Sequence, residues 1–145
     1  MENVRVFEVR ECKEEYLVAV NCLLGQLSTK ECVLSRDDFE NLVSSDTSHL
    51  FLLLCGSAII GMLCVCVYVC PTGRKVWIED VVVYSEFRGR AFGKLLVNYA
   101  MDYAKSLGNV TVMLTSRPTR IAANVLYRSV GFKIKETNVY CKKLS

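Results

Sequence analysis

The run LFLLLCGSAIIGMLCVCVYVC, from Leu50 to Cys70, decides the fold of this chain. It carries no charged side chain over its twenty-one residues, a length that could cross a bilayer as a helix. Gly56 and Ser57 stand together inside it, however, and Gly-Ser is a turn signal that divides the run into two pieces of strand length. The second piece is rich in β-branched and aromatic residues, which favour a pleated strand. We therefore expect a buried β-hairpin, Leu50 to Cys55 and Ala58 to Cys70, and no membrane span.

The composition indicates a single soluble domain that covers residues 1–145. With 52% hydrophobic and 23% charged residues, the chain is neither disordered nor fibrous. The net charge of +3 is small and the basic residues are scattered, so the sequence does not indicate nucleic-acid binding, although the basic excess suits an anionic small ligand. No apolar run follows a basic head at the N-terminus, so no signal peptide is visible and we expect a cytoplasmic protein.

The eight cysteines indicate neither a zinc site nor a disulfide framework. They form no C-x-x-C pair, and His49 is the single histidine available to complete a metal site, so we expect no metal. Cys64, Cys66 and Cys70 share one strand face at period two. We expect the cysteines to be small apolar core residues, and a metal or redox site is the alternative.

Strands and helices follow one another in a mixed order along the rest of the chain. The further expected strands are Val4 to Arg10, Lys75 to Tyr84, Val110 to Leu114, Phe132 to Lys135 and Asn138 to Leu144. The expected helices are Lys13 to Leu27, Arg36 to Val43, Ala91 to Leu107 and Thr119 to Val130. This order predicts an α+β layer with a mixed sheet.

The stretch SEFRGRAFGKLL, from Ser85 to Leu96, carries the clearest chemistry. A strand passes directly into a helix there, which leaves backbone N–H groups unpaired at the positive end of the helix dipole. Gly89 and Gly93 permit tight curvature and a close approach of a ligand. Three basic side chains add positive charge at the same place: Arg88, Arg90 and Lys94. The stretch predicts a phosphate site, and an ordinary turn with solvated arginines is the alternative, because neither the Walker spacing nor the dinucleotide fingerprint is present.

This stretch resembles the pyrophosphate-binding motif of the GCN5-related N-acetyltransferases, which is Arg or Gln, two residues, Gly, one residue, then Gly or Ala. Here it reads Arg88, Gly89-Arg90, Ala91, Phe92, Gly93, with Ala91 where the family usually has a glycine. Alanine keeps the N–H but resists positive φ. AANVLYRSVGF, from Ala122 to Phe132, looks like the second family signature, and IEDVVV looks like the central strand. The resemblance implies a mixed, mostly antiparallel central sheet with helices on both faces.

The same resemblance implies acetyl-coenzyme A as the acetyl donor, without a metal. The pyrophosphate would bind the residues from Arg88 to Lys94, and the pantetheine would follow the strand at Val81, Val82 and Val83. An N–H near Val82 or Val83, left free where the sheet splays, would polarise the thioester carbonyl.

For the chemical step, the resemblance implies direct attack by a primary amine in a ternary complex. Glu79 or Asp80 would accept the proton of the amine, and because adjacent strand residues point to opposite faces, we expect only one of them, with Glu79 preferred, to face the site. Asn124 and Tyr127 share a helix face. Asn124 would bind the cofactor arm or a water, and Tyr127 would protonate the departing thiolate. The alternatives are a carboxylate paired with a basic side chain and a helix face that only packs.

Two alternatives concern the function itself, and the identity of the acceptor is a separate question. A thiol such as Cys66 could carry the acyl group, and the domain could be a non-catalytic acetyl-coenzyme A sensor or interaction module. The acceptor could be a small amine, an amino sugar, an aminoglycoside or a protein lysine. We expect no nucleic-acid or membrane partner, and the apolar strand edges at the C-terminus are compatible with a homodimer.

Overall fold

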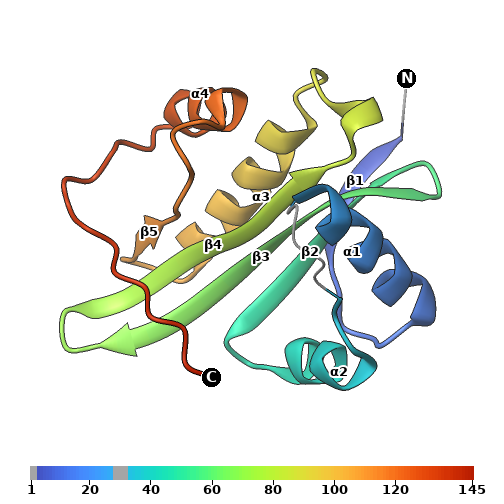
Figure 1. The fold of residues 1–145 in the computed structure, drawn as a ribbon, viewed down its shortest axis with the longest axis horizontal. Helices are drawn as coiled ribbons and strands as arrows, with labels where there is room; N and C mark the ends of the chain where they lie inside the picture. The colour runs from blue at the N-terminus through green and yellow to red at the C-terminus, as the bar shows by residue number, and fades with distance from the viewer. Residues whose placement is uncertain (1–2, 28–32) are drawn as a thin grey trace. The chain divides into compact units, whose positions relative to one another are not determined.

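The computed structural model describes residues 3–27 and 33–145, and it divides into two compact units, residues 1–115 and residues 116–145. The described part of the first unit is a five-stranded sheet with three α-helices (Figure 1). Its elements are β1 (Val4–Glu8), α1 (Glu14–Leu27), α2 (Arg36–Ser44), β2 (Ser48–Cys55), β3 (Ala58–Cys70), β4 (Gly73–Val83), the 3-10 turn η1 (Ser85–Phe87), α3 (Phe92–Ser106) and β5 (Thr111–Met113). The second unit contains the helix α4 (Ile121–Ser129).

The predicted hairpin is present. β2 and β3 pair antiparallel around a turn in which Gly56 adopts φ +62°, and β3 and β4 form a second hairpin that closes at Cys70 and Gly73. The strand order is β1-β2-β3-β4-β5, antiparallel except for the parallel pair of β4 and β5. The predicted α+β fold with a mixed, mostly antiparallel sheet is confirmed. In the described ranges, no helix combines the length and apolar character needed to cross a membrane.

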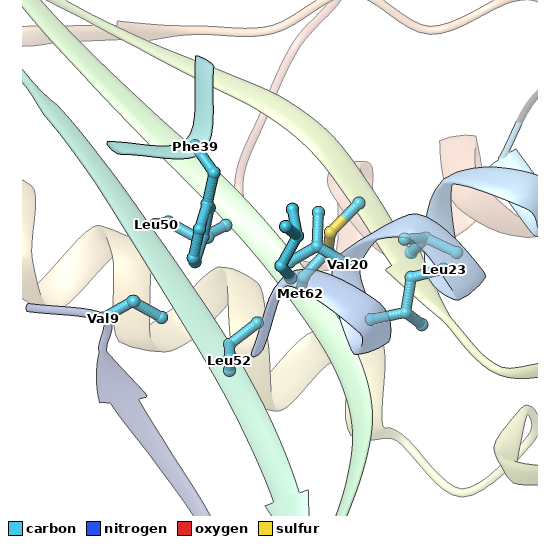
Figure 2. Packing of buried hydrophobic residues seen from close by; sticks show 9 residues of the cluster. Val9, Val20, Leu23, Phe39, Leu50, Leu52 and Met62 are labelled. Atoms are coloured by element: carbon cyan, nitrogen blue, oxygen red, sulfur yellow. The ribbon is translucent and has the colours of Figure 1, made fainter. Parts of the chain in front are cut away.

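Alternation along β2 sends its side chains to two faces of the sheet. Leu50 and Leu52 pack with Leu23 of α1 and Phe39 of α2 in a cluster of buried apolar residues (Figure 2). Each such side chain stabilises the fold by roughly 1.5–3 kcal/mol when it leaves water. This cluster holds the two N-terminal helices on one face.

The opposite face packs on α3. Phe51, between Leu50 and Leu52, contacts the rings of Tyr99 and Tyr103, with centroid distances of 5.3 and 5.7 Å. Gly61 of β3 lies so close to α3 that a Cβ there would meet Leu96 Cδ1 at 3.2 Å. Helices therefore cover both faces of the sheet, and Tyr99 and Tyr103 of α3 pack against it.

The single histidine belongs to this packing and not to a catalytic triad. His49 Nδ1 is 2.9 Å from Glu8 Oε2, and its Nε2 is 2.9 Å from the Tyr103 hydroxyl. The ring thus links β1, β2 and α3 through two hydrogen bonds.

The two predicted C-terminal strands, Phe132 to Lys135 and Asn138 to Leu144, are wrong. The structure assigns no strand after β5 in residues 116–145, and the apolar side chains there are exposed, Ile134 at 85% and Tyr140 at 88%. The sequence pattern reflects β propensity, but a strand also needs a neighbour with which to form hydrogen bonds.

The prediction of core cysteines is wrong for most of the described positions. Cys64 is buried, Cys55, Cys66 and Cys70 are half-buried, and three are exposed: Cys12, Cys22 and Cys141. All of these are free thiols, and Cys32 lies outside the described residues. A cysteine resembles an apolar residue in a sequence pattern, but it does not need to be buried.

Candidate active site

Helix α3 begins without a side chain of its own to cap it. Its N-cap residue, Ala91, makes no side-chain hydrogen bond, and the first turn holds no acidic residue. The bond from Leu95 N to Ala91 O (3.1 Å) spans the first turn of the helix, so the N–H groups of Phe92, Gly93 and Lys94 precede the helical ladder. The positive end of this fifteen-residue helix can therefore receive an anion.

The N-terminus of α2 shows the opposite arrangement. The Ser35 hydroxyl oxygen accepts a hydrogen bond from Asp38 N (3.1 Å), and Asp37 and Asp38 place carboxylates in the first turn. The chain thus satisfies the positive end of α2 with its own residues, whereas at α3 it supplies none. Together with the glycines and the basic side chains of the preceding turn, this contrast with α2 supports the start of α3 as the candidate phosphate site.

The turn before α3 uses left-handed backbone at two positions. Gly89 has φ +80° and Ala91 has φ +63°. Ala91 therefore adopts the curvature that its Cβ resists, at a cost of roughly 1–2 kcal/mol. The three basic side chains of the turn are exposed, and the Arg90 guanidinium lies 5.6 Å from the Phe87 ring centroid.

We expect Ala91→Gly to stabilise the fold. Relief of the left-handed strain gains about 1–2 kcal/mol, and the extra freedom of glycine in the unfolded chain removes about 0.4–1 kcal/mol. The free energy of unfolding should therefore rise by about 1 kcal/mol in a denaturant titration. Ala122→Gly, on an exposed position of α4, is the control and should destabilise by a similar amount. Equal losses in both variants would contradict the strain at Ala91.

The edge of β4 next to this turn is open. β5 pairs with β4 only from Lys75 to Trp77, so beyond Trp77 this edge of β4 carries no strand in the described residues. Tyr84 N donates to Ile60 O (2.9 Å), toward β3. Because successive residues of an antiparallel ladder direct their backbone groups alternately toward and away from the partner strand, Val83 directs its N–H and C=O to the open edge.

A hydrogen bond connects the turn to this edge. Arg88 Nε donates to the carbonyl oxygen of Val83 (3.2 Å). The bond agrees with the direction deduced for the Val83 backbone, and it holds the basic turn beside the open part of β4. The predicted phosphate-binding and pantetheine-binding segments are thus adjacent.

The two candidate carboxylates lie at a β-bulge. Met62 pairs with Val82 and Cys64 with Glu79, so Asp80 and Val81 together oppose one residue of β3, and Asp80 has φ +53°. Regular alternation was the basis for expecting only one carboxylate at the site, and the bulge breaks that alternation. Both side chains are exposed.

Neighbouring parts of the chain still remove some of the water around these exposed side chains, which raises the pKa of both carboxyl groups, and the charge of Asp80 raises the pKa of Glu79 further. Glu79 lies on the face covered by α1 and α2, because its cross-strand partner Cys64 is itself opposite Leu50. A carboxyl with a raised pKa is suited to accept a proton near neutral pH.

Asn124, on α4 in the second unit, has its amide nitrogen engaged locally. The nitrogen donates to the carbonyl oxygens of Arg117 (2.9 Å) and Arg120 (2.8 Å), which shapes the turn before α4. The amide oxygen is therefore the group that could reach a ligand.

Tyr127, three residues further along α4, is buried, and its ring packs edge-on against Phe132 with centroids 6.2 Å apart. Burial raises the pKa of its hydroxyl, so the group stays protonated over the working pH range. Because the hydroxyl is protonated, it can donate a proton, as a general acid must.

Two features of the first unit were not predicted from the sequence: the bulge at Asp80 and the bond between Arg88 and Val83. The run IEDVVV did contain a signal for the bulge. Two adjacent acidic residues followed by three valines do not fit a period of two, and a break in that period marks a bulge.

Known proteins share the fold over nearly the whole chain. A family model described as the acetyltransferase (GNAT) family matches residues 16–132. A glucosamine 6-phosphate N-acetyltransferase of Arabidopsis thaliana is 28% identical in an alignment that covers 91% of this chain and 90% of the relative. The crystal structure of a glucosamine-6-phosphate N-acetyltransferase from Arabidopsis thaliana superposes with a TM-score of 0.80 at 25% identity, covering 97% of this chain and 99% of that one.

A solved aminoglycoside N-acetyltransferase, AAC(6')-Iy in complex with coenzyme A, has the same fold, with a TM-score of 0.79 at 18% identity, over 99% of this chain and 96% of that one. Both of these solved structures, which share the α+β fold, are acetyltransferases. The chain belongs to the acetyltransferase (GNAT) family. It is an acetyl-coenzyme A-dependent N-acetyltransferase.

Proposed function

We propose that the chain transfers the acetyl group of acetyl-coenzyme A directly to a primary amine of a small-molecule acceptor, in a ternary complex. The observation that carries the proposal is the Arg88 to Val83 hydrogen bond, which holds an uncapped helix N-terminus beside the open edge of β4. The start of α3 then offers N–H groups for a pyrophosphate, and the adjacent edge of β4 offers backbone groups for the pantetheine. Two carboxylates lie on the same strand.

The cofactor would bind in an extended form along this edge. Its pyrophosphate would accept hydrogen bonds from the N–H groups of the α3 start, and Arg88, Arg90 and Lys94 would neutralise its charge. Of the two predicted oxyanion donors, we favour Val83 over Val82, because the alternation fixed by the Tyr84 to Ile60 bond directs Val83 N–H to the open edge. We further propose that the two units act as one domain, since the family match runs across residues 115 and 116.

The acceptor class we propose is an amino sugar or a related small amine. Support comes from the relatives, one named for glucosamine 6-phosphate and one for aminoglycosides. The test is release of the coenzyme A thiol from acetyl-coenzyme A in the presence of single amines: amino sugars, their phosphates, aminoglycosides and a lysine peptide. Thiol release with a sugar amine and none with the peptide is the expected result. Release with the peptide alone would reject a small-molecule acceptor.

We expect Glu79→Gln to lower turnover by about 10²-fold, because the amide cannot accept the proton of the amine. Asp80→Asn is the matched variant, since asparagine tolerates the left-handed backbone that the bulge requires. Steady-state kinetics of the two variants identify the base. A larger loss in Asp80→Asn would transfer the role to Asp80.

The raised pKa of Glu79 also predicts how turnover and folding stability change with pH. Wild-type turnover should fall as the pH drops through a pKa above the usual glutamate range, because the base becomes protonated. A carboxyl whose folded pKa is raised favours the folded state at low pH, and this contribution is lost as the pH rises through the folded pKa. Glutamine stays neutral, so the melting temperature of Glu79→Gln at pH 7 should equal or exceed that of the wild type. A lower melting temperature would indicate a structural role for the carboxylate.

A further inference from the structure

Two thiols meet on the face of β3 that α1 and α2 cover. Cys64 and Cys66 are two residues apart on the strand, and their Sγ atoms are 3.9 Å apart. Cys64 is buried, whereas Cys66 is half-buried. The Ser48 hydroxyl on β2 donates a hydrogen bond to Cys66 Sγ (3.9 Å). Cys66, the less buried cysteine of the pair, therefore has two hydrogen-bonding neighbours, Cys64 and Ser48.

These hydrogen bonds favour the thiolate of Cys66. The bond with Cys64 and then the bond from Ser48 lower the pKa of Cys66, although partial burial and the carboxylates of Glu79 and Asp80 oppose them. The same bond and burial raise the pKa of Cys64. The pair thus consists of a half-buried cysteine whose thiolate is favoured and a buried cysteine that stays protonated beside it, the arrangement of an attacking and a resolving cysteine.

The pair lies next to the candidate catalytic base. Cys64 is directly opposite Glu79 and Cys66 is opposite Trp77 in the pairing of β3 with β4. Any change of backbone geometry at the two cysteines therefore acts on the strand segment that carries Glu79.

We propose that Cys64 and Cys66 are a redox site that hydroperoxides oxidise to a reversible disulfide, and that this disulfide slows acetyl transfer. The second half rests on the proposed role of Glu79. The first half does not need the proposed function, because it depends on the distance between the two thiols and on the hydrogen bonds of Cys66.

The chemistry balances with one hydroperoxide. The Cys66 thiolate attacks one peroxide oxygen, the O–O bond breaks, and Cys66 becomes a sulfenic acid while the other oxygen takes up a proton and leaves as water or an alcohol. The Cys64 sulfur then attacks the Cys66 sulfur, and the sulfenic oxygen leaves as water with the proton of the Cys64 thiol. The two thiols lose two electrons and two protons, and the peroxide accepts both.

The disulfide formed in this way would be easily reduced. Residues two apart on an extended strand have Cα atoms about 6.4–6.8 Å apart, near the upper end of the range of about 4.4–6.8 Å that disulfides span. Closing the bond therefore bends the strand or strains the bond, and strained disulfides are the labile ones. The same bending would move the residues opposite Glu79, and a misplacement of about 1 Å at a reacting group can cost about 10²-fold in rate.

The test treats the reduced full-length protein with hydrogen peroxide and follows its intact mass and fragment masses without reduction. The expected result is the loss of two hydrogen atoms, mapped to a bond between Cys64 and Cys66. Cys64→Ala also removes the hydrogen bond that favours the Cys66 thiolate, so the reaction should be slower and should stop at a sulfenic acid on Cys66, which a dione reagent traps. Cys70→Ser is the control, because Cys70 is a separate thiol at the β3–β4 turn, and it should behave as the wild type. A disulfide through other cysteines, or trapping at Cys70 instead of Cys66, would overturn the site.

Acetyl transfer is measured on the same samples. Transfer should fall by roughly 10²-fold on oxidation and return with a dithiol reductant, and Cys66→Ser should stay active and resist peroxide. Full oxidation with unchanged transfer would overturn the coupling to activity. If the reduced wild type transferred no acetyl group, the proposed function would fail, and the mass measurements would still decide the redox site.

Discussion

Replacing Tyr127 with phenylalanine should lower turnover by about 10²- to 10⁴-fold, the range for removal of one general acid. Tyr127 is buried, and its raised pKa keeps the hydroxyl protonated, so it can supply a proton to a coenzyme A thiolate that forms away from bulk water. The variant removes the hydroxyl and keeps the ring that packs on Phe132. Folding and acetyl-coenzyme A binding should therefore be nearly unchanged, as checked by thermal unfolding and titration calorimetry.

Tyr140→Phe is the matched control, because Tyr140 is 88% exposed in the same unit and should lose its hydroxyl without effect. Rapid mixing separates the chemical step from product release, and the larger loss is expected if chemistry limits the rate. If Tyr127→Phe kept wild-type turnover on a verified acceptor, Tyr127 would be a packing residue and the thiolate would take its proton from water.

Gly93→Asp should abolish useful binding of acetyl-coenzyme A. Gly93 is the second residue of α3, within the uncapped first turn. A carboxylate about 4 Å from a pyrophosphate charge costs roughly 4 kcal/mol at an effective dielectric constant of 20, so the dissociation constant should rise by about 10³-fold. The aspartate also offers its own oxygen to the helix N-terminus and would compete with the phosphate.

Thermal unfolding with and without cofactor measures this effect. At a hundred times its dissociation constant, acetyl-coenzyme A should stabilise the wild type by about 2.7 kcal/mol, and Gly93→Asp should show no shift at the same concentration. Gly25→Asp is the control, because Gly25 lies on α1 with open space around its Cβ position, and it should keep the shift. A shift retained in Gly93→Asp would place the phosphate site elsewhere on the chain.

The elements of the first unit could be predicted from local signals. Gly56 and Ser57 indicated the turn of the first hairpin, and the helix expected from Arg36 begins there, after the N-cap Ser35. The stretch from Arg88 to Gly93 predicted the phosphate site because its residue types act through nearby backbone groups. Signals of this kind depend only on residues close in sequence, so the amino-acid sequence alone contains them.

Tertiary contacts decided what local signals could not. The bulge at Asp80 depends on the register between β3 and β4. It breaks the alternation from which we expected only one of Glu79 and Asp80 to face the site, and both side chains are exposed. The C-terminal strands failed for the same kind of reason, since strand propensity without a paired neighbour does not make a strand.

The meeting of Cys64 with Cys66 and Ser48, like the hydrogen bond from Arg88 to Val83, likewise follows from how strands and turns lie against one another. The sequence by itself determined the fold class, the hairpin and the residue types of the site. The three-dimensional structure decided which backbone groups face the open edge of β4 and which side chains from different strands lie side by side, because hydrogen-bond direction and strand register depend on pairing between distant segments.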